Sequence, residues 1–228
     1  MERTSQHVAD GVLTITMDDG KVNVLSPLMW AELDEGLDRA EQDDVGAVVI
    51  AGRPGRFSGG FDLSVLQGDD AGAARGMLRA GFVTAERVLS FPKPVVMACT
   101  GHSIAMGSFL MLSGDYRIGA AGDFRIQAIE VAIGMALPEA ALAIMRYRLT
   151  RPAFDRAVGL AEVFTPETAV TGGYLDRIVA PDDVVQTAQD TAAGFASTLD
   201  QQAHHTSKLR ARTTVLGELR AAIDADFR

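Results

Sequence analysis

Two short apolar runs, each followed directly by a glycine-rich turn, constrain the fold of this chain more than any other feature. The runs are Ala47–Ala51 and Val95–Cys99, and the turns extend over residues 52–61 and 101–108. Five consecutive apolar residues beside turn residues are typical of a strand that is buried on both faces. We therefore expect two buried strands, each leading into a tight connection.

The rest of the chain alternates between strand and helix patterns. A β-hairpin is expected about Asp10-Gly11, because both residues accept positive φ. Ser26 can cap free backbone N–H groups, and Pro27 suits the first position of a helix. Further elements are predicted as helices over residues 71–89 and 138–149, a turn and a helix over residues 101–112, and strands over residues 116–120 and 176–179. This order predicts an α/β fold.

The C-terminal part is almost wholly helical beyond about Pro152, and its last predicted helix covers residues 206–225. That helix mixes apolar and charged residues, so it can cover its own core or a neighbouring subunit. We divide the chain into a core over residues 1–180 and a C-terminal helical region over residues 181–228. The second region is expected to belong to the same compact unit and to an oligomer interface.

The composition excludes several classes of function. The 228 residues carry a formal net charge of −9, whereas nucleic-acid binding uses clustered Lys and Arg. No apolar run approaches the ~20 residues that span a membrane, and the polar N-terminus does not resemble a secretion signal. We therefore expect a cytoplasmic protein without nucleic-acid or membrane partners.

Neither a disulfide framework nor a metal site is expected. Cys99 is the single cysteine and lies in an apolar run, which favours a buried, inert thiol. The pair His204-His205 lacks a second ligand at helical spacing, and acidic pairs such as Asp18-Asp19 are typical of turns.

The segment Gly101–Ala105 is similar to the turn that presents a nucleophilic serine in α/β-hydrolases. Its last position is alanine, however, and the only downstream histidines are His204 and His205. The acid and the oxyanion-loop glycines of a hydrolase cannot be identified. We expect Ser103 to be a structural serine.

The two glycine-rich turns, FSGGFDL at residues 57–63 and GHSIAMGS at residues 101–108, have two interpretations. The first N–H groups of a helix have no partner inside the helix, so two such turns could direct donors at one oxygen. Glycine content alone favours simple strand-to-helix connections.

Glu130 favours the functional interpretation. It lies among apolar residues in the segment 126–133, where a buried carboxylate is costly unless it is paired or used in catalysis. Burial without a cation would raise its pKa, which suits a general base near neutral pH. The alternatives are a strand with Glu130 on its solvated face, or a pairing with a nearby arginine such as Arg125.

Taken in order, these segments resemble the enoyl-CoA hydratase/isomerase, or crotonase, family. The resemblance covers most of the chain, in residues 20–26, 47–63 and 93–118, at Glu130 and Gly134, and in residues 166–169 and 173–176. It implies a spiral of β-β-α units with a helical C-terminal region, and assembly as a homotrimer or a dimer of trimers. It also implies an acyl-coenzyme A thioester as substrate, with no metal and no cofactor other than the coenzyme A of that substrate.

The resemblance assigns roles by motif position. The backbone N–H groups of Phe61 and Met106 would bind the thioester oxygen, and Glu130 would be the catalytic base. Lys21 falls in the segment that would lie along coenzyme A. The positions expected to bind substrate are Lys21, Gly60, Asp62, Leu63 and Phe109.

Phe109 departs from the hydratase pattern. It falls where hydratases place one of two catalytic glutamates, whereas Glu130 matches the other. Addition of water is easier to explain with two carboxylates, and phenylalanine exchanges no proton. A single glutamate resembles the Δ3-Δ2-enoyl-CoA isomerases, in which one base moves a proton from C2 to C4 through a dienolate.

We therefore predict an enoyl-CoA isomerase-like enzyme. The enzymatic alternative is a hydratase with a replacement carboxylate, Glu139 or Asp62. The alternative from another class is a catalytically silent protein that binds acyl-coenzyme A.

Overall fold

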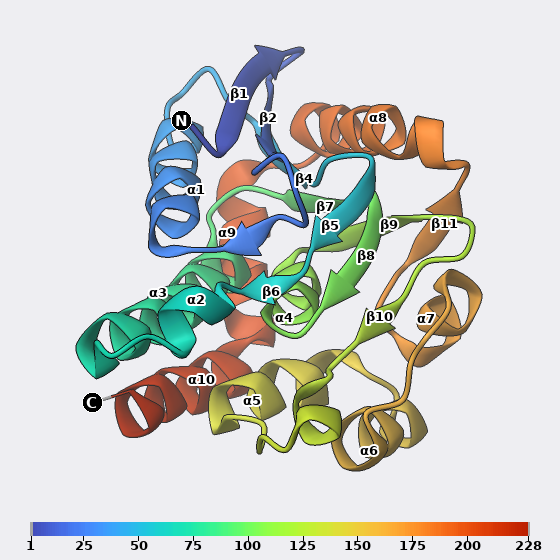
Figure 1. Ribbon diagram of the computed structural model, residues 1–228. Helices are drawn as coiled ribbons and strands as arrows, with labels where there is room; N and C mark the ends of the chain where they lie inside the picture. The colour runs from blue at the N-terminus through green and yellow to red at the C-terminus, as the bar shows by residue number, and fades with distance from the viewer. Residues whose placement is uncertain (1, 228) are drawn as a thin grey trace.

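A computed structural model describes residues 2–227 (Figure 1). The strands are β1 (Thr4–Ala9), β2 (Val12–Met17), β3 (Val24–Leu25), β4 (Ala47–Ala51), β5 (Gly55–Ser58), β6 (Gly60–Phe61), β7 (Val95–Cys99), β8 (Gly101–Ile104), β9 (Tyr116–Ala120), β10 (Ile126–Gln127) and β11 (Arg177–Val179). The helices are α1 (Pro27–Ala40), α2 (Leu63–Leu66), α3 (Ala71–Ser90), α4 (Met106–Ser113), α5 (Glu139–Arg148), α6 (Arg151–Leu160), α7 (Pro166–Gly172), α8 (Val184–Thr198), α9 (Gln201–Ala211) and α10 (Thr213–Asp226), with 3-10 helices η1 (Glu130–Ile133) and η2 (Pro181–Asp183). Within residues 2–227, no helix has the length and apolar character needed to cross a bilayer.

The elements follow one another as β-β-α units. The first strands β2, β4, β7 and β9 are parallel neighbours in a six-stranded sheet of order β1-β2-β4-β7-β9-β11. The second strands leave this sheet: β5, β8 and β10 form a separate parallel sheet, and β3 pairs with β6. The expected β-β-α spiral is therefore confirmed, as is the hairpin of β1 and β2.

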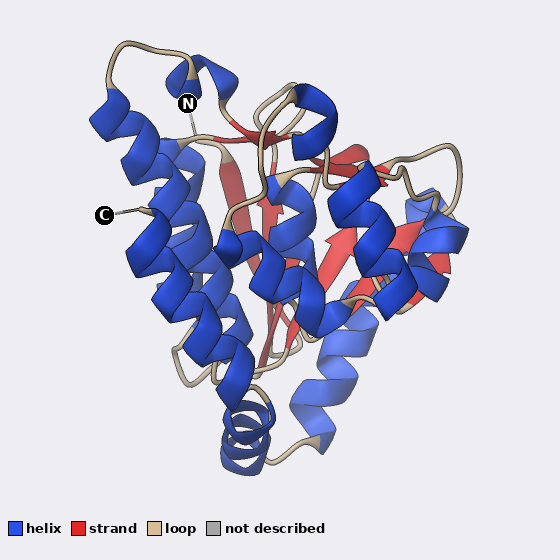
Figure 2. Ribbon diagram, turned by 90° about the horizontal axis from the view of Figure 1, so that it is seen from below, coloured by secondary structure: helices blue, strands red, loops and turns tan. Residues whose placement is uncertain are grey.

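Burial on both faces accounts for the all-apolar strands. β4 and β7 are buried at every position, because α8 covers one face of the large sheet and the main core covers the other. Val49 and Val96 belong to one buried apolar cluster with Ala188 of α8, whereas the main core includes Leu33 of α1 and Leu110 of α4. Figure 2 shows the strands in the middle of the molecule with helices on either side.

Three segments differ from the expectation. Residues 52–61, expected as a turn, contain the short strands β5 and β6, which pair with β8 and β3. Gly101–Ile104, expected as a turn, is strand β8, because it pairs with β5 on one side and β10 on the other. The helix predicted over residues 206–225 is two helices, α9 and α10, separated at Arg212. The Arg212 side chain is buried and donates to the carbonyl oxygen of Leu89 (2.7 Å). α10 then packs on α3 and α5 of its own chain.

A buried ion cluster fastens α9 and α10 to the core. Asp115, between α4 and β9, accepts hydrogen bonds from the Val95 N–H (2.8 Å) and from Lys208 Nζ (2.7 Å), and it pairs with Arg212 (2.7 Å). The Lys208 and Arg212 side chains are only 3% and 8% exposed. Burial alone would raise the pKa of Asp115, but the two cations outweigh burial and hold that pKa below its usual value.

Replacing Asp115 with Asn should lower the free energy of unfolding by about 3–5 kcal/mol, because two buried cations lose their counter-charge. Denaturant unfolding followed by circular dichroism measures the loss. The control, Asp155→Asn, removes an exposed pair with Arg151 and should cost less than about 1 kcal/mol. Equal losses in the two variants would contradict this account of the cluster.

Candidate active site

The two glycine-rich turns meet in the structure. The first contains β6, and the second, residues 101–108, passes from β8 through Ala105 into the start of α4. A Cβ atom added at Gly60 would lie 3.0 Å from the carbonyl oxygen of Ile104 and 3.5 Å from the nitrogen of Met106. The peptide that carries the Phe61 N–H therefore lies beside the N–H of Met106.

The backbone at this meeting point has an unusual conformation. Ala105 has φ 51° and ψ −127°, and Gly60 has φ 91°. A positive φ is uncommon for a residue with a side chain, and such strained positions cluster at functional sites. Met106 is the first residue of α4, and Ala105 provides no side-chain cap. The Met106 N–H thus belongs to the donors that a helix leaves without an internal acceptor.

Close contact brings α4 against the first turn. A Cβ atom at Gly107 would lie 2.7 Å from the Cβ of Ser58, so a side chain there would displace the turn. Ser58 Oγ accepts a hydrogen bond from the Gly60 N–H (3.0 Å) and donates one to the carbonyl oxygen of Asn23 (2.7 Å). The buried Asn23 amide in turn donates to the carbonyl oxygen of Phe57 (3.2 Å). Asn23 therefore braces the turn that carries the first donor.

An apolar cavity of about 250 Å³ is lined by Phe61 and by Ala105, the residue that precedes Met106, whereas Met106 itself is buried and does not line it. Of residues 2–227, Glu130 is the one acidic residue that lines it. The lining residues are Gly59, Phe61, Leu63, Leu66, Leu78, Phe82, Ile104, Ala105, Phe109, Ile129, Glu130, Ile133, Met135 and Pro138. The exposed Leu63 and Ile133 mark the mouth of the cavity, whereas the buried Phe82 and Phe109 close its inner end.

Glu130 lies at the start of η1, a tight turn that Gly134 ends with φ 80°. The residue is 8% exposed, and no atom of the described chain forms a hydrogen bond with its Oε2. Burial raises the pKa of Glu130 to about 7, and no cation counteracts this effect. Neither alternative considered for Glu130 holds, because it lies neither on a solvated strand nor in an ion pair with Arg125.

The other predicted acidic and apolar positions differ in their relation to this cavity. Phe109 lines it and is 1% exposed. Asp62 caps α2 by accepting hydrogen bonds from the N–H (2.9 Å) and Oγ (2.6 Å) of Ser64. Glu139 is exposed at the start of α5. Neither Asp62 nor Glu139 lines the cavity.

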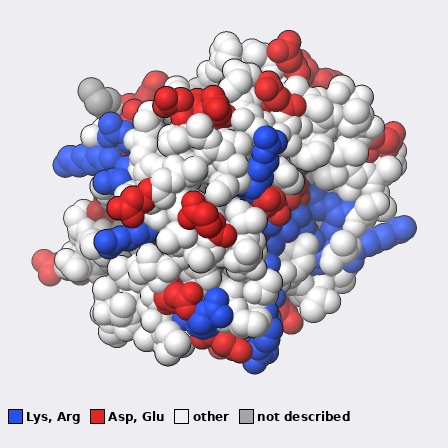
Figure 3. Space-filling view, turned by 90° about the vertical axis from the view of Figure 1, so that its right-hand side faces the viewer, with Lys and Arg blue, Asp and Glu red and all other residues white. Residues whose placement is uncertain are grey.

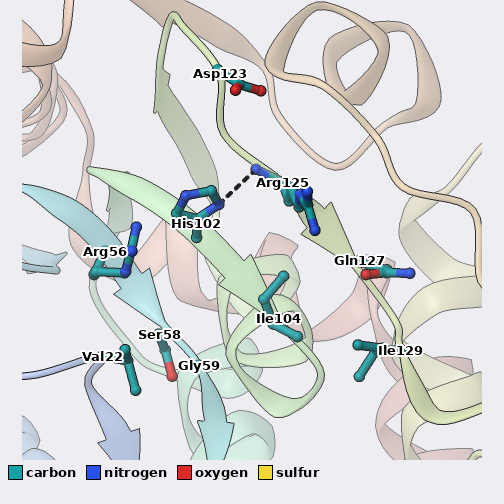
Figure 4. A pocket seen from close by; sticks show the side chains of 10 residues that line it. All are labelled: Val22, Arg56, Ser58, Gly59, His102, Ile104, Asp123, Arg125, Gln127 and Ile129. Carbon is teal, nitrogen blue, oxygen red and sulfur yellow. Dashed lines mark hydrogen bonds between the residues drawn. The ribbon is translucent and has the colours of Figure 1, made fainter. Parts of the chain in front are cut away.

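A polar groove of about 590 Å³ crosses the sheet β10-β8-β5 (Figure 4). Arg56 comes from β5, His102 from β8 and Arg125 from the residue before β10, and the three side chains line one hollow. His102 Nδ1 accepts a hydrogen bond from the backbone N–H of Arg125 (3.0 Å). Burial and the two guanidinium groups lower the pKa of His102. At neutral pH the groove therefore presents two guanidinium cations and a neutral imidazole, together with the carboxylate of Asp123, which also lines it.

The groove and the apolar cavity adjoin, because Gly59, Ile104 and Ile129 line both. Lys21 is exposed and precedes Val22, which lines the groove. The meeting point of the two turns thus lies between an apolar compartment and a polar one.

The groove was not predictable from the sequence, because residues 101–104 were expected to form a turn rather than a strand with two faces. On strand β8 successive side chains point to opposite faces, so His102 faces the groove and Ser103 faces inward. Had residues 101–104 been recognised as a strand, this alternation would have predicted that His102 and Ile104 share one face.

The residues set aside as structural are buried. Ser103 is fully buried, with its Oγ 3.5 Å from Ser108 Oγ. Cys99 is also buried, and burial raises the pKa of its thiol to about 12, as expected of an inert cysteine. In residues 2–227, no three His, Cys, Asp or Glu side chains gather as a metal site would require.

The surface charge gives no broad basic region on the face seen in Figure 3. Acidic and basic side chains are interspersed there, and Lys and Arg side chains gather mainly in one hollow.

Comparison with known sequences points to one family. The model of the family described as enoyl-CoA hydratase/isomerase matches residues 7–227. A probable enoyl-CoA hydratase of Mycobacterium avium, EchA17, is 31% identical over 217 residues, which are 92% of this chain and 80% of the relative.

Solved structures agree. A Mycobacterium tuberculosis protein is 52% identical to this chain, with a TM-score of 0.94, over 98% of this chain and 96% of the other. That protein is described as an enoyl-CoA isomerase in one solved structure and as the probable enoyl-CoA hydratase EchA3 in another. Human mitochondrial Δ3-Δ2-enoyl-CoA isomerase is 26% identical with a TM-score of 0.92, over 99% of this chain and 89% of the other. The predicted fold class is therefore confirmed, and this chain belongs to the enoyl-CoA hydratase/isomerase, or crotonase, family.

Proposed function

We propose that this protein moves the double bond of an enoyl-coenzyme A thioester by a 1,3-proton transfer, with Glu130 as its single base. One observation carries the proposal: among the described residues, Glu130 alone brings a carboxylate to the apolar cavity, and its Oε2 has no protein partner there. A carboxylate with a pKa of about 7 can take up and return a proton near neutral pH.

In the proposed reaction, the N–H groups of Phe61 and Met106 donate to the thioester oxygen of a 3-enoyl substrate. Glu130 takes a proton from C2, and the electron pair of that C–H bond becomes part of a dienolate whose oxygen faces the two donors. The protonated Glu130 then gives its proton to C4, which yields the 2-enoyl thioester and restores the carboxylate. No atom is gained or lost, and the only cofactor involved is the coenzyme A of the substrate.

The coenzyme A part of the substrate is proposed to lie along the polar groove. A thioester held at the two N–H groups would have the apolar cavity on its acyl side and the groove on its other side. Arg56 and Arg125 are suitable partners for phosphate groups in that groove. Lys21, next to the groove residue Val22, would supply a further cation.

Hydration of a 2-enoyl thioester is the second candidate, and the relatives with hydratase names favour it. It needs groups that hold the water and supply the second proton. Asp62 and Glu139 lie outside the cavity lining, and Phe109 has no proton to exchange. This arrangement supports isomerisation over hydration. A silent binding protein would have no need for a base inside the acyl cavity, so we place it last.

Changing Glu130 to Gln should lower turnover of a 3-enoyl-coenzyme A by about 10²–10⁴-fold, because the general base is lost. Affinity for a saturated acyl-coenzyme A should be retained, since the two N–H donors and the cavity remain. Turnover and calorimetric affinity are measured side by side. Unchanged turnover would show that Glu130 is not the base.

The pH dependence of kcat/KM should follow the ionisation of Glu130. The base must be ionised, so kcat/KM should fall about tenfold per pH unit below pH 7 and level off above it. The folded pKa lies above the unfolded value of 4.5, so ionisation of Glu130 opposes folding as the pH rises from about 4.5 to 7. The melting temperature of Glu130→Gln at pH 8 should accordingly be no lower than that of the unchanged protein. A large drop would indicate a structural role instead.

Changing Phe109 to Glu should introduce hydration, because a second carboxylate would then line the same cavity as Glu130. Mass spectrometry separates the products, since hydration adds one water and isomerisation leaves the mass unchanged. Phe109→Gln, which has the same shape as the Glu variant but no titratable group, is the matched control. Hydration by both variants, or by neither folded variant, would argue against this role of the second carboxylate.

We further propose a homotrimer or a dimer of trimers, on the basis of family membership. Light scattering at micromolar concentrations should give a mass of three or six chains. A monomer across that range would refute the proposed assembly.

A further inference from the structure

The inner end of the apolar cavity is closed by aromatic rings. Phe61, Phe82 and Phe109 all line it. The centroid of the Phe82 ring lies 6.3 Å from that of Phe61 and 6.2 Å from that of Phe109. Phe82 and Phe109 are 0% and 1% exposed, so this end of the cavity does not lead to solvent. Phe82, on α3, is the ring that joins the other two into one wall.

Other side chains pack against the far side of these aromatic rings, so the rings have little room to move away from the cavity. Behind Phe61 lies Trp30, whose ring centroid is 6.1 Å away, and behind Phe82 lies Phe227 at the end of α10, at 5.4 Å. Gly81 lies against the rings of Phe61 and Trp30, because a Cβ atom added to it would be 2.7 Å from Phe61 and 2.9 Å from Trp30. An acyl chain that reached these rings would therefore have to displace a packed core.

The volume of the cavity limits the number of acyl carbon atoms that it can hold. A buried apolar cavity of about 150 Å³ holds a benzene molecule, which has six carbon atoms. At the same ratio, the cavity of about 250 Å³ holds roughly ten carbon atoms.

We propose that Phe82 is the specificity-determining residue for acyl-chain length, and that it limits the bound chain to about ten carbons. This inference rests on the proposed function, because it takes the cavity to be the acyl compartment. The Phe82 side chain is apolar and exchanges no proton, so its substitution should change which chain binds rather than how the proton moves.

The test measures the affinity of saturated acyl-coenzyme A esters from four to sixteen carbons by calorimetry, which requires no turnover. For the unchanged protein, affinity should rise about fourfold with each added methylene up to roughly ten carbons and then stop rising. In Phe82→Ala the limit should move to chains at least two carbons longer. Phe82→Leu, which keeps a large apolar side chain, should also move the chain-length limit to longer chains. This variant serves as the test if the alanine variant does not fold.

Phe91→Leu is the matched control. Phe91 is also buried and follows α3 directly, but it does not line the cavity. The chain length at which affinity stops rising should therefore be the same in Phe91→Leu as in the unchanged protein. Affinity that keeps rising to sixteen carbons in the unchanged protein would overturn the inference while leaving the proposed function intact. A limit that stays at the same length in a folded Phe82 variant would overturn the role of Phe82. Failure of every ester to bind would instead contradict the proposed function.

Discussion

The close contact between the two glycine-rich turns is the constraint on which the rest of this structure depends. Gly60, Ala105 and Gly107 let the backbones approach until the peptide of Phe61 lies beside the N–H of Met106. The positive φ of Ala105 costs of order 1–3 kcal/mol, which surrounding interactions must offset. The parallel pairing of β8 with β5 and β10 supplies part of this support, because it fixes the two turns on adjacent strands.

The same apolar enclosure serves both halves of the proposed chemistry. It removes water from around Glu130, which raises the pKa of that carboxylate to about 7. It also surrounds the two N–H donors with a medium of low dielectric constant, in which their interaction with a developing oxyanion is stronger than in water. The cost is an unpartnered carboxylate oxygen in the core, and such a cost is typical of a functional site rather than of a structural one.

Much of the fold was predictable because it depends on local pattern. The runs at β4 and β7, the Ser26 cap of α1 and the Asp10-Gly11 hairpin all carry signals within a few residues. Strand β8 was missed because its pairing with distant strands defines it. The division between α9 and α10 was also missed, because it is accompanied by the burial of Arg212 against Asp115, which is a tertiary contact. Glu130 was singled out from its apolar neighbours, but its short 3-10 turn and the charged groove depend on tertiary contacts that no local pattern contains.

The central claim, that one carboxylate carries a proton from C2 to C4, is tested most directly by isotope transfer. A 3-enoyl-coenzyme A that carries deuterium at C2 is converted in ordinary water, and the early product is analysed by mass spectrometry and NMR. The account predicts a 2-enoyl product with part of the deuterium at C4, because the same carboxyl group that removes the label returns it. A main product heavier by one water, with no deuterium at C4, would contradict the account.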